Sequence, residues 1–285
     1  MSVTIAAGAA TKREQFLKDG FCKFENVVTP EMLDELRRVT DDLLDKAPPS
    51  DLAYVRYQGS NVEVNYQDPV FAKLFAWPQT MAAIASIGYP NPKLLSGHLL
   101  SKPPQGPALY WHQDWAGWSD PSSAWLEPPQ IFVMYYLTST RRENGCLRVI
   151  PGSHLKRNPL HDILPEAHTE ASYTASMDSP GFSIRPDEVD IPVTAGDILV
   201  GDARVLHAAH ANQTDARRSC LTIWYFPDFE RLSEPIQSLF ARKTPTKPPQ
   251  WWEGDAGKPV ERLVPWYKGT AKPLQWNRIP GEHLK

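Results

Sequence analysis

Tyr110-Trp111-His112-Gln113-Asp114 is the stretch that decides the fold of this chain and the chemistry of its candidate site. An apolar run precedes it and favours a β-strand, in which the side chains of His112 and Asp114 leave the same face. An imidazole and a carboxylate on one face are two of the three ligands in the two-histidine, one-carboxylate set that binds Fe(II) and leaves coordination positions open. A third ligand is then expected from elsewhere in the chain.

His207 is the expected third ligand, and Arg218 accompanies it. His207 follows a predicted strand about ninety residues later, and Arg218 begins the returning strand beyond the loop 211–216. This hairpin would place a guanidinium in the interior that holds the metal. A 2-oxo acid chelates Fe(II) through its C1 carboxylate and keto oxygen, and its distal carboxylate suits the two-pronged donor that arginine provides. With five positions filled, one position of an octahedral iron remains for O2.

Neighbouring residues compete for these roles. Arg217 is the alternative to Arg218, and adjacent residues on a strand point oppositely, so only one of them can enter the interior. His210 lies three residues past His207, cannot share its face in a regular strand, and is expected to be a surface or packing histidine. The remaining histidines without partner spacing are expected to be structural or exposed, namely His98, His161, His168 and His283.

Aromatic residues surround the first pair of ligands. Tyr110 shares their face, so its ring is expected inside the fold, either in the substrate pocket or as core filling. Trp115 and Trp118 lie on the loop that leaves the metal-bearing strand. Exposed indole rings are costly, so they either pack under the C-terminal segment or form the pocket wall. We expect the pocket wall, which implies a substrate with apolar or cationic surface.

Composition excludes several classes of function. The chain has 285 residues, a net charge of -3 and 22% charged residues, so it lacks a basic surface for nucleic acid or anionic membranes. No apolar run approaches the ~20 residues of a membrane span, and the first ten residues lack a secretory apolar region. Cys22, Cys146 and Cys220 have no metal or disulfide spacing and are expected to be buried thiols. We therefore expect a soluble cytoplasmic protein.

The first third of the chain is predicted to be mainly helical. A short helix is expected over 11–19, followed by an edge strand over 21–27. Thr29-Pro30 and Asp68-Pro69 each combine a capping residue with a proline at the first helical position. The first of these helices should end before Pro48, and the second should continue in two pieces to Ile87.

From Lys93 onward the pattern changes to strands. Apolar runs predict strands at 94–100, 130–138, 146–150, 191–193, 198–200 and 218–226, in addition to the metal-bearing strand. The irregular insertion over about 160–187 is longer than compact domains usually contain and could serve as a lid. The proline-rich tail is expected to pack on the rest through Trp251, Trp252, Trp266 and Trp276.

We predict a single domain over 1–285, mainly β with flanking helices. Its parts are N-terminal helices at about 11–90, a barrel core at about 93–226 and a tail at 227–285. The core is predicted to be a distorted double-stranded β-helix, a cupin-like jelly roll.

The chain resembles the phytanoyl-CoA dioxygenase family of Fe(II)/2-oxoglutarate oxygenases over roughly Gly20 to Phe226. The matching motifs are Trp111-His112-Gln113-Asp114, Glu143-Asn144-Gly145-Cys146-Leu147, Ile150-Pro151-Gly152-Ser153-His154, Gly196-Asp197, His207 and Arg218. The resemblance implies that His112, Asp114 and His207 bind iron. Family spacing selects Arg218 over Arg217 for 2-oxoglutarate. The motif ending at His154 forms turns in the family, so His154 receives no catalytic role.

The resemblance also indicates a reaction type. Some relatives replace the carboxylate ligand with a small residue and halogenate, so Asp114 favours hydroxylation, or a desaturation or ring rearrangement, of a small organic molecule with release of succinate and CO2. Secondary-metabolite biosynthesis is a candidate setting. The stretch Trp111 to Trp118 is also similar to the signature of ectoine hydroxylases, whose continuation is missing here.

Two rival functions use the same ligands. A zinc hydrolase or metal isomerase on the same barrel would need no deep arginine, and a non-catalytic metal-binding barrel would act as a small-molecule sensor. The sequence predicts neither the substrate nor the oligomeric state.

Overall fold

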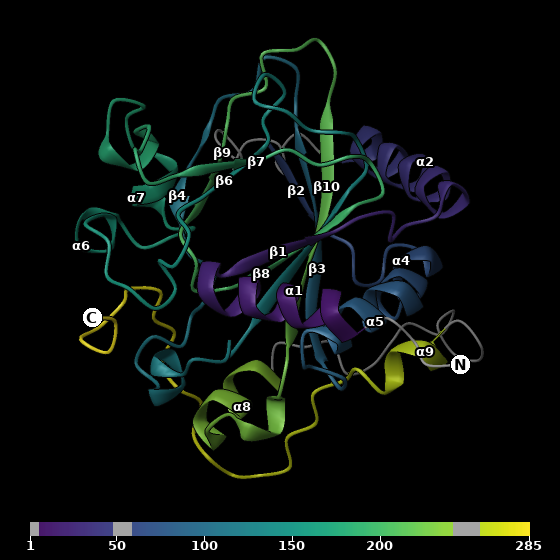
Figure 1. Cartoon of the computed structure of the whole chain (residues 1–285). Coiled ribbons are helices and arrows are strands. Elements are labelled where there is room, and N and C mark those ends of the chain that lie inside the picture. The colour runs from purple at the N-terminus through teal and green to yellow at the C-terminus, as the bar shows by residue number, and fades with distance from the viewer. Residues whose placement is uncertain (1–5, 48–58, 242–256) are drawn as a thin grey trace.

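Two antiparallel sheets pack against each other in the computed structural model, which describes residues 6–47, 59–241 and 257–285 (Figure 1). The larger sheet has the order β1 (Phe21–Phe24), β8 (Ile198–Asp202), β5 (Ile131–Tyr136), β10 (Arg218–Phe226), β3 (Lys93–Lys102), β2 (Ser60–Glu63). The smaller sheet has the order β4 (Leu109–His112), β9 (His207–Ala209), β6 (Leu147–Val149), β7 (Val189–Ile191).

The central strand β5 of the larger sheet is buried on both faces. Phe132, Met134 and Tyr136 pack with Leu147 and Val149 of β6 between the two sheets. The alternate residues of β5 face the opposite way, into the core beneath the helices. Because successive side chains of a strand point to opposite faces, a strand between two cores reads as one continuous apolar run. The two-sheet core confirms the predicted jelly-roll fold.

Helices α1 (Ala6–Asp19), α2 (Pro30–Lys46), α4 (Pro69–Phe75) and α5 (Pro78–Ser86) contribute to the core on the outer face of the larger sheet (Figure 1). Thr29 Oγ1 accepts a hydrogen bond from the backbone N–H of Met32 at 3.3 Å, and Asp68 Oδ1 accepts one from Val70 at 2.9 Å. Both predicted helix starts are confirmed, because each cap satisfies a backbone donor that the first helical turn leaves unpaired.

Several predicted boundaries differ from the structure. The helix predicted over 11–19 starts at Ala6, and the strand predicted over 21–27 ends at Phe24, before Asn26 turns with φ +55°. The strand predicted at 191–193 is instead β7, which ends at Ile191 because Pro192 has no N–H to donate. The sequence indicated neither β2 nor the helix α8 (Glu234–Ala241).

The insertion and the tail lie beside the smaller sheet and the core. The insertion contains α6 (Leu160–Ile163), α7 (Glu170–Tyr173) and the 3-10 turn η2 (Pro180–Phe182), which lies against β4. The remaining short elements are η1 (Pro121–Ala124), η3 (Phe229–Arg231) and α9 (Lys258–Glu261).

The tail packs only in part as expected. Trp276 packs against Phe240, but the expectation for Trp266 was wrong, because that ring is 61% exposed. Trp251 and Trp252 lie outside the described residues. Within the described ranges, no helix combines the length and the apolar character needed to cross a bilayer.

Candidate metal centre and adjoining cavity

Pairing of β4 with β9 brings two predicted metal ligands together. His112 and His207 are direct partners in the antiparallel register, and their ring centroids lie 4.1 Å apart. Asp114 follows two residues after His112, where its backbone N–H donates to Ala203 O at 2.9 Å. Its Oδ1 lies 3.7 Å from His112 Nε2, and its Oδ2 lies 3.9 Å from His207 Nε2.

The three side chains form a buried group of metal-ligand atoms. One such atom from each lies within 4.8 Å of the others, and all three residues are buried. His112 Nδ1 lies 3.0 Å from Tyr110 O, and His207 Nδ1 lies 3.1 Å from Val205 O. A carbonyl oxygen only accepts, so each Nδ1 carries the proton and each Nε2 presents a lone pair to the shared space. Burial, and secondly the neighbouring His207, lower the pKa of His112 well below its ordinary value, which favours the neutral imidazole that a metal requires.

Trp224 of β10 orients the carboxylate ligand. Its Nε1 donates to Asp114 Oδ2 at 2.8 Å. Burial alone would raise the pKa of the Asp114 carboxyl, but His207, His168 and His112 lower it further than burial raises it. Asp114 is therefore a fixed anion that faces three imidazole rings, an arrangement suited to holding a cation.

Arg218 lies in the same interior as the metal ligands. It lines a small cavity of about 40 Å³ together with His112, Asp114 and His207. Only 7% of the residue is exposed, its Nε has no hydrogen-bond partner, and Nη1 donates to Cys220 Sγ at 3.6 Å. Among the described residues it forms no ion pair with a carboxylate. A buried guanidinium with an unused donor fits the carboxylate of a bound small molecule.

Arg217 points to the opposite side of the sheet. Its guanidinium lies 3.8 Å from Asp41 and 3.5 Å from Asp45 of α2, with 39% of the side chain exposed. Strand alternation thus separates the two candidate arginines. Lys102 was not anticipated beside Arg218. It is the register partner of Arg218 on β3 and is almost fully buried, and burial, with Arg218, lowers its pKa well below the ordinary value.

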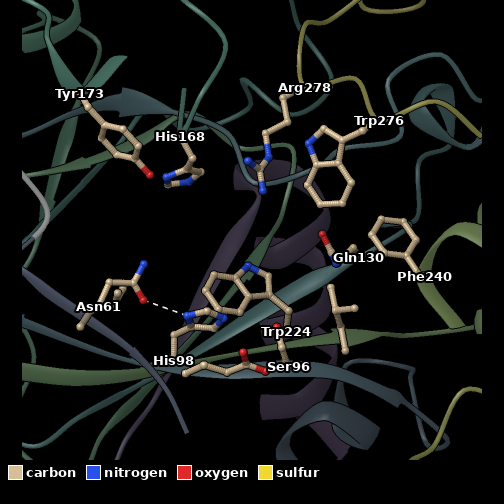
Figure 2. Close-up of a pocket in the computed structure, with 13 residues that line it drawn as sticks. Asn61, Ser96, His98, Gln130, His168, Tyr173, Trp224, Phe240, Trp276 and Arg278 are labelled. Carbon is tan, nitrogen blue, oxygen red and sulfur yellow. Dashed lines mark hydrogen bonds between the residues drawn. The ribbon is translucent and has the colours of Figure 1, made fainter. Parts of the chain in front are cut away.

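A larger cavity of about 330 Å³ adjoins the metal ligands (Figure 2). Trp224 lines both this cavity and the small one, so the two are neighbours. Four of the lining residues are tyrosine, tryptophan or phenylalanine, and most of the others are polar or charged. The lining residues are Asn61, Glu63, Leu95, Ser96, His98, Leu100, Gln130, His168, Tyr173, Trp224, Phe240, Trp276 and Arg278.

His168 is a site residue that the sequence did not reveal. It was expected to be structural or exposed, but its Nε2 lies 3.8 Å from Asp114 Oδ1 and its ring lies 5.1 Å from that of His112. Its backbone has φ +61°, a conformation that residues other than glycine seldom adopt. The insertion that carries His168 thus contributes directly to the site, and only its unusual length was visible in the sequence.

Tyr110 connects the metal-bearing strand to the insertion. Its ring lies edge-on to His112 at 5.3 Å, and its hydroxyl lies 3.4 Å from both His168 Nδ1 and Ser172 Oγ. Tyr110 is inside the fold, as expected, but it does not line the larger cavity. Tyr110 therefore contacts His168 from the side that faces away from the larger cavity.

The pocket wall predicted for Trp115 and Trp118 is wrong. Both are fully buried in a cluster with α8 and the tail, where Trp115 stacks on Phe240 at 5.8 Å and donates to Ser123 Oγ at 2.9 Å. The chain turns away from the cavity after Asp114, so these rings enter the core behind it. Trp224 and Trp276, distant in the sequence, line the cavity instead.

The other histidines divide between the cavity and the scaffold. His98 lines the larger cavity, contrary to expectation, and its Nδ1 lies 2.8 Å from Asn61 Oδ1. His161 accepts from the backbone of Asn158, and His283 is exposed, as expected. His210 pairs with Asp190 at 2.6 Å, away from the metal ligands, in a separate group with Cys146.

A jelly roll that brings two histidines and an aspartate together beside a buried arginine is the arrangement that characterises the class of non-haem iron, 2-oxoglutarate-dependent oxygenases. Within that class, the chain belongs to the phytanoyl-CoA dioxygenase (PhyH) family, whose model matches residues 16–220.

Named relatives agree with this assignment. Phytanoyl-CoA dioxygenase 1 of Oryza sativa subsp. japonica is 27% identical over 186 residues, which cover 64% of this chain and 61% of that protein. Ectoine dioxygenase of Nocardia farcinica is 25% identical over 254 residues, covering 80% of this chain and 81% of that protein. The chain thus spans less than two thirds of the rice protein.

The fold is shared with solved structures. The non-heme alpha-ketoglutarate-dependent epimerase SnoN from nogalamycin biosynthesis superposes with a TM-score of 0.59 at 19% identity, over 77% of this chain and 83% of that one. At this level of identity the likeness concerns the fold.

Proposed function

We propose that this chain is an Fe(II)- and 2-oxoglutarate-dependent dioxygenase that hydroxylates a small organic molecule. One observation carries the proposal: three metal-ligand side chains share a buried cavity with an arginine that has no carboxylate partner in the described part of the chain. The overall reaction would be R–H + O2 + 2-oxoglutarate → R–OH + succinate + CO2. A zinc hydrolase requires the three ligands but has no use for the arginine.

The donor set fits iron. Two neutral imidazole nitrogens and one carboxylate, arranged on one side of a shared space, match the facial triad of non-haem iron oxygenases. When bound with 2-oxoglutarate and O2, iron supplies the oxidising power that breaks a substrate C–H bond. Hydrogen bonds to backbone carbonyls orient His112 and His207, and the hydrogen bond from Trp224 orients Asp114. The protein itself therefore fixes the orientation of all three ligands.

Arg218 would bind the distal carboxylate of 2-oxoglutarate. Its burial excludes water, and a charge-assisted hydrogen bond strengthens when water is excluded. The planar guanidinium can donate two parallel bonds, which fixes the orientation of the cosubstrate as well as its affinity. Asp114 as the carboxylate ligand favours hydroxylation over halogenation.

The substrate would occupy the larger cavity. Its volume of about 330 Å³ lies at the small end of the range of ligand sites, so it suits a small molecule. The solved relative SnoN is described as an enzyme of nogalamycin biosynthesis, and we propose secondary metabolism as the setting here too. The ectoine dioxygenase relative makes ectoine a second candidate substrate.

Cysteine usage favours a reducing compartment. All three cysteines are free and buried. Structural disulfides are common in oxidising compartments and rare in the cytosol, so we extend the proposal to a cytoplasmic location.

The decisive experiment measures succinate after reconstitution with Fe(II) and 2-oxoglutarate without oxygen, followed by addition of O2. We expect succinate release that requires all three components, with added ascorbate supplying the two electrons that a substrate C–H bond would otherwise provide. Asp114→Ala should abolish it. Asp190→Ala is the matched control, because Asp190 belongs to the separate group with Cys146 and His210.

The rivals give different outcomes. Hydrolysis supported by zinc without O2 consumption would favour the hydrolase. Failure to consume 2-oxoglutarate with iron and any candidate substrate would favour the sensor. Retained oxidation in Asp114→Ala would remove the carboxylate from the mechanism.

A further inference from the structure

Arg278 is the feature of the larger cavity that its general shape does not explain. It lies in the tail, outside the region matched by the family model, and its guanidinium points into the cavity beside Trp276 (Figure 2). The centre of the guanidinium lies 4.7 Å from the centroid of the Trp276 ring. Stacking on an indole fixes the plane of the guanidinium and leaves its edge free to donate.

Arg278 has donors left over for a ligand. Its Nε donates to Asp114 O at 3.4 Å and its Nη1 donates to Ala167 O at 3.3 Å. These bonds use two of the five N–H donors of an arginine. Among the described residues its side chain forms no ion pair with a carboxylate. Arg278 is half-buried and lines the cavity, so its remaining donors can reach a molecule bound there.

The charge of the cavity lining is otherwise low. Among the described residues that line the cavity, Arg278 is the only lysine or arginine. His98 Nδ1 already pairs with Asn61 Oδ1 at 2.8 Å. Glu63 is exposed, and its Oε1 already accepts from Asn65 Nδ2 at 2.5 Å. The cavity thus has one cationic end, at Arg278, and aromatic walls formed by Trp224, Trp276 and Phe240.

We infer that the substrate is a small carboxylic acid with an apolar or aromatic body, whose carboxylate is bound by Arg278. This inference rests on the proposed function and specifies the substrate class of the same cavity. A single guanidinium without a neighbouring lysine suits a carboxylate better than a doubly charged phosphate. Because Arg278 touches the backbone of Asp114, the acid group would lie close to the metal ligands.

The test measures binding rather than turnover. The metal-free protein is titrated by calorimetry with a series of phenyl-substituted and straight-chain carboxylic acids of four to ten carbons, each paired with its own neutral amide. We expect at least one acid to bind at least tenfold more tightly than its amide, since a hydrogen bond to a charged group contributes about that factor. Arg278→Gln should remove this preference while leaving binding of the amide unchanged.

Two variants separate recognition from folding. Arg278→Gln also removes donors that connect the tail to Asp114 and Ala167, so unchanged amide binding shows that the cavity survives. Arg278→Lys should restore part of the preference for the acid. Arg262→Gln, at an exposed tail arginine outside the cavity, should retain all of it.

The outcomes also separate this inference from the proposed function. If no acid binds more tightly than its amide, or if the preference persists in Arg278→Gln, the inference is overturned. The proposed function is tested separately, by succinate release in the wild type and in Arg262→Gln, so acid binding without any succinate release would overturn the proposed function and not the assignment of Arg278. A raised 2-oxoglutarate requirement in Arg278→Gln would instead assign Arg278 to the cosubstrate and overturn the inference.

Discussion

Arg217 and Arg218 are adjacent residues with opposite environments. Arg217 faces the carboxylates of α2 at the surface, whereas Arg218 faces the metal ligands in the interior. The difference follows from the two-residue repeat of a β-strand. Arg217 is therefore a matched control for Arg218 in tests of the proposed cosubstrate site, because the same substitution can be made on either face of one sheet.

Arg218→Ala should raise the 2-oxoglutarate concentration for half-maximal succinate release by about 10- to 100-fold, the effect of losing a hydrogen bond to a charged group. Arg217→Ala should leave it within about twofold, because exposed ion pairs contribute little. The rate of succinate release, measured for both variants over a range of 2-oxoglutarate concentrations, tests this assignment. A larger effect from Arg217→Ala would contradict the assignment.

Trp224→Phe should weaken metal binding. The ring would remain, but the hydrogen bond from Nε1 to Asp114 Oδ2 would be lost, and losing such an orienting partner typically costs about 10- to 100-fold in metal affinity. Calorimetric titration with Mn(II) measures this directly. Trp276→Phe is the matched control, because its ring lines the same cavity and lies over Arg278. Equal affinity in wild type and Trp224→Phe would remove Trp224 from this role.

At the scale of elements, capping residues place the helices that cover the larger sheet. Thr29 begins α2 at the point where the chain leaves the edge strand β1, and Leu36 and Val39 of that helix enter the core beneath it. The sequence predicted this start for two reasons. The threonine side chain can accept a hydrogen bond from a backbone N–H of the first turn, and the proline at the first helical position has no N–H to leave unpaired. The helices of the insertion, α6 and α7, have only four residues each, too few for an apolar periodicity, so they were not predicted.

Thr29→Ala should lower the free energy of unfolding by about 1 kcal/mol, since the side-chain bond to the N–H of Met32 would be lost. Urea denaturation followed by circular dichroism measures the change. Thr29→Ser keeps the hydroxyl and should stay close to wild type. A loss of equal size in both variants would point to the threonine methyl group rather than the cap.

At the scale of the whole molecule, the metal ligands bring together segments that lie far apart in the sequence. His112 and His207 come from strands about ninety residues apart and meet only through the pairing of β4 with β9. A ligand that binds only the folded state stabilises that state by mass action. Metal binding should therefore stabilise the entire fold against unfolding.

Mn(II) at about one hundred times its Kd should raise the melting temperature by about 5 °C, as follows from roughly 2.7 kcal/mol of linkage free energy. His207→Ala should abolish the shift. His210→Ala should preserve it, because His210 belongs to the separate group with Cys146 and Asp190. Scanning calorimetry with and without metal measures all three proteins. A shift lost in His210→Ala and kept in His207→Ala would move the metal site to that other group.

The sequence by itself determined the features that depend on a few neighbouring residues. His112 and Asp114 share a face, Arg217 and Arg218 oppose each other, and the caps of α2 and α4 start where predicted, because backbone geometry sets these relations locally. The family motifs, in addition, supported the prediction of the jelly-roll fold.

Only the tertiary structure decided which distant residues surround the metal ligands. It brought His168 and Arg278 into the site, moved Trp115 and Trp118 into the core, and placed Trp224 on Asp114. No periodicity links these positions, because packing of the insertion and the tail against the sheets brings them together. Side-chain contacts across a hundred residues depend on that packing, which local sequence patterns do not encode.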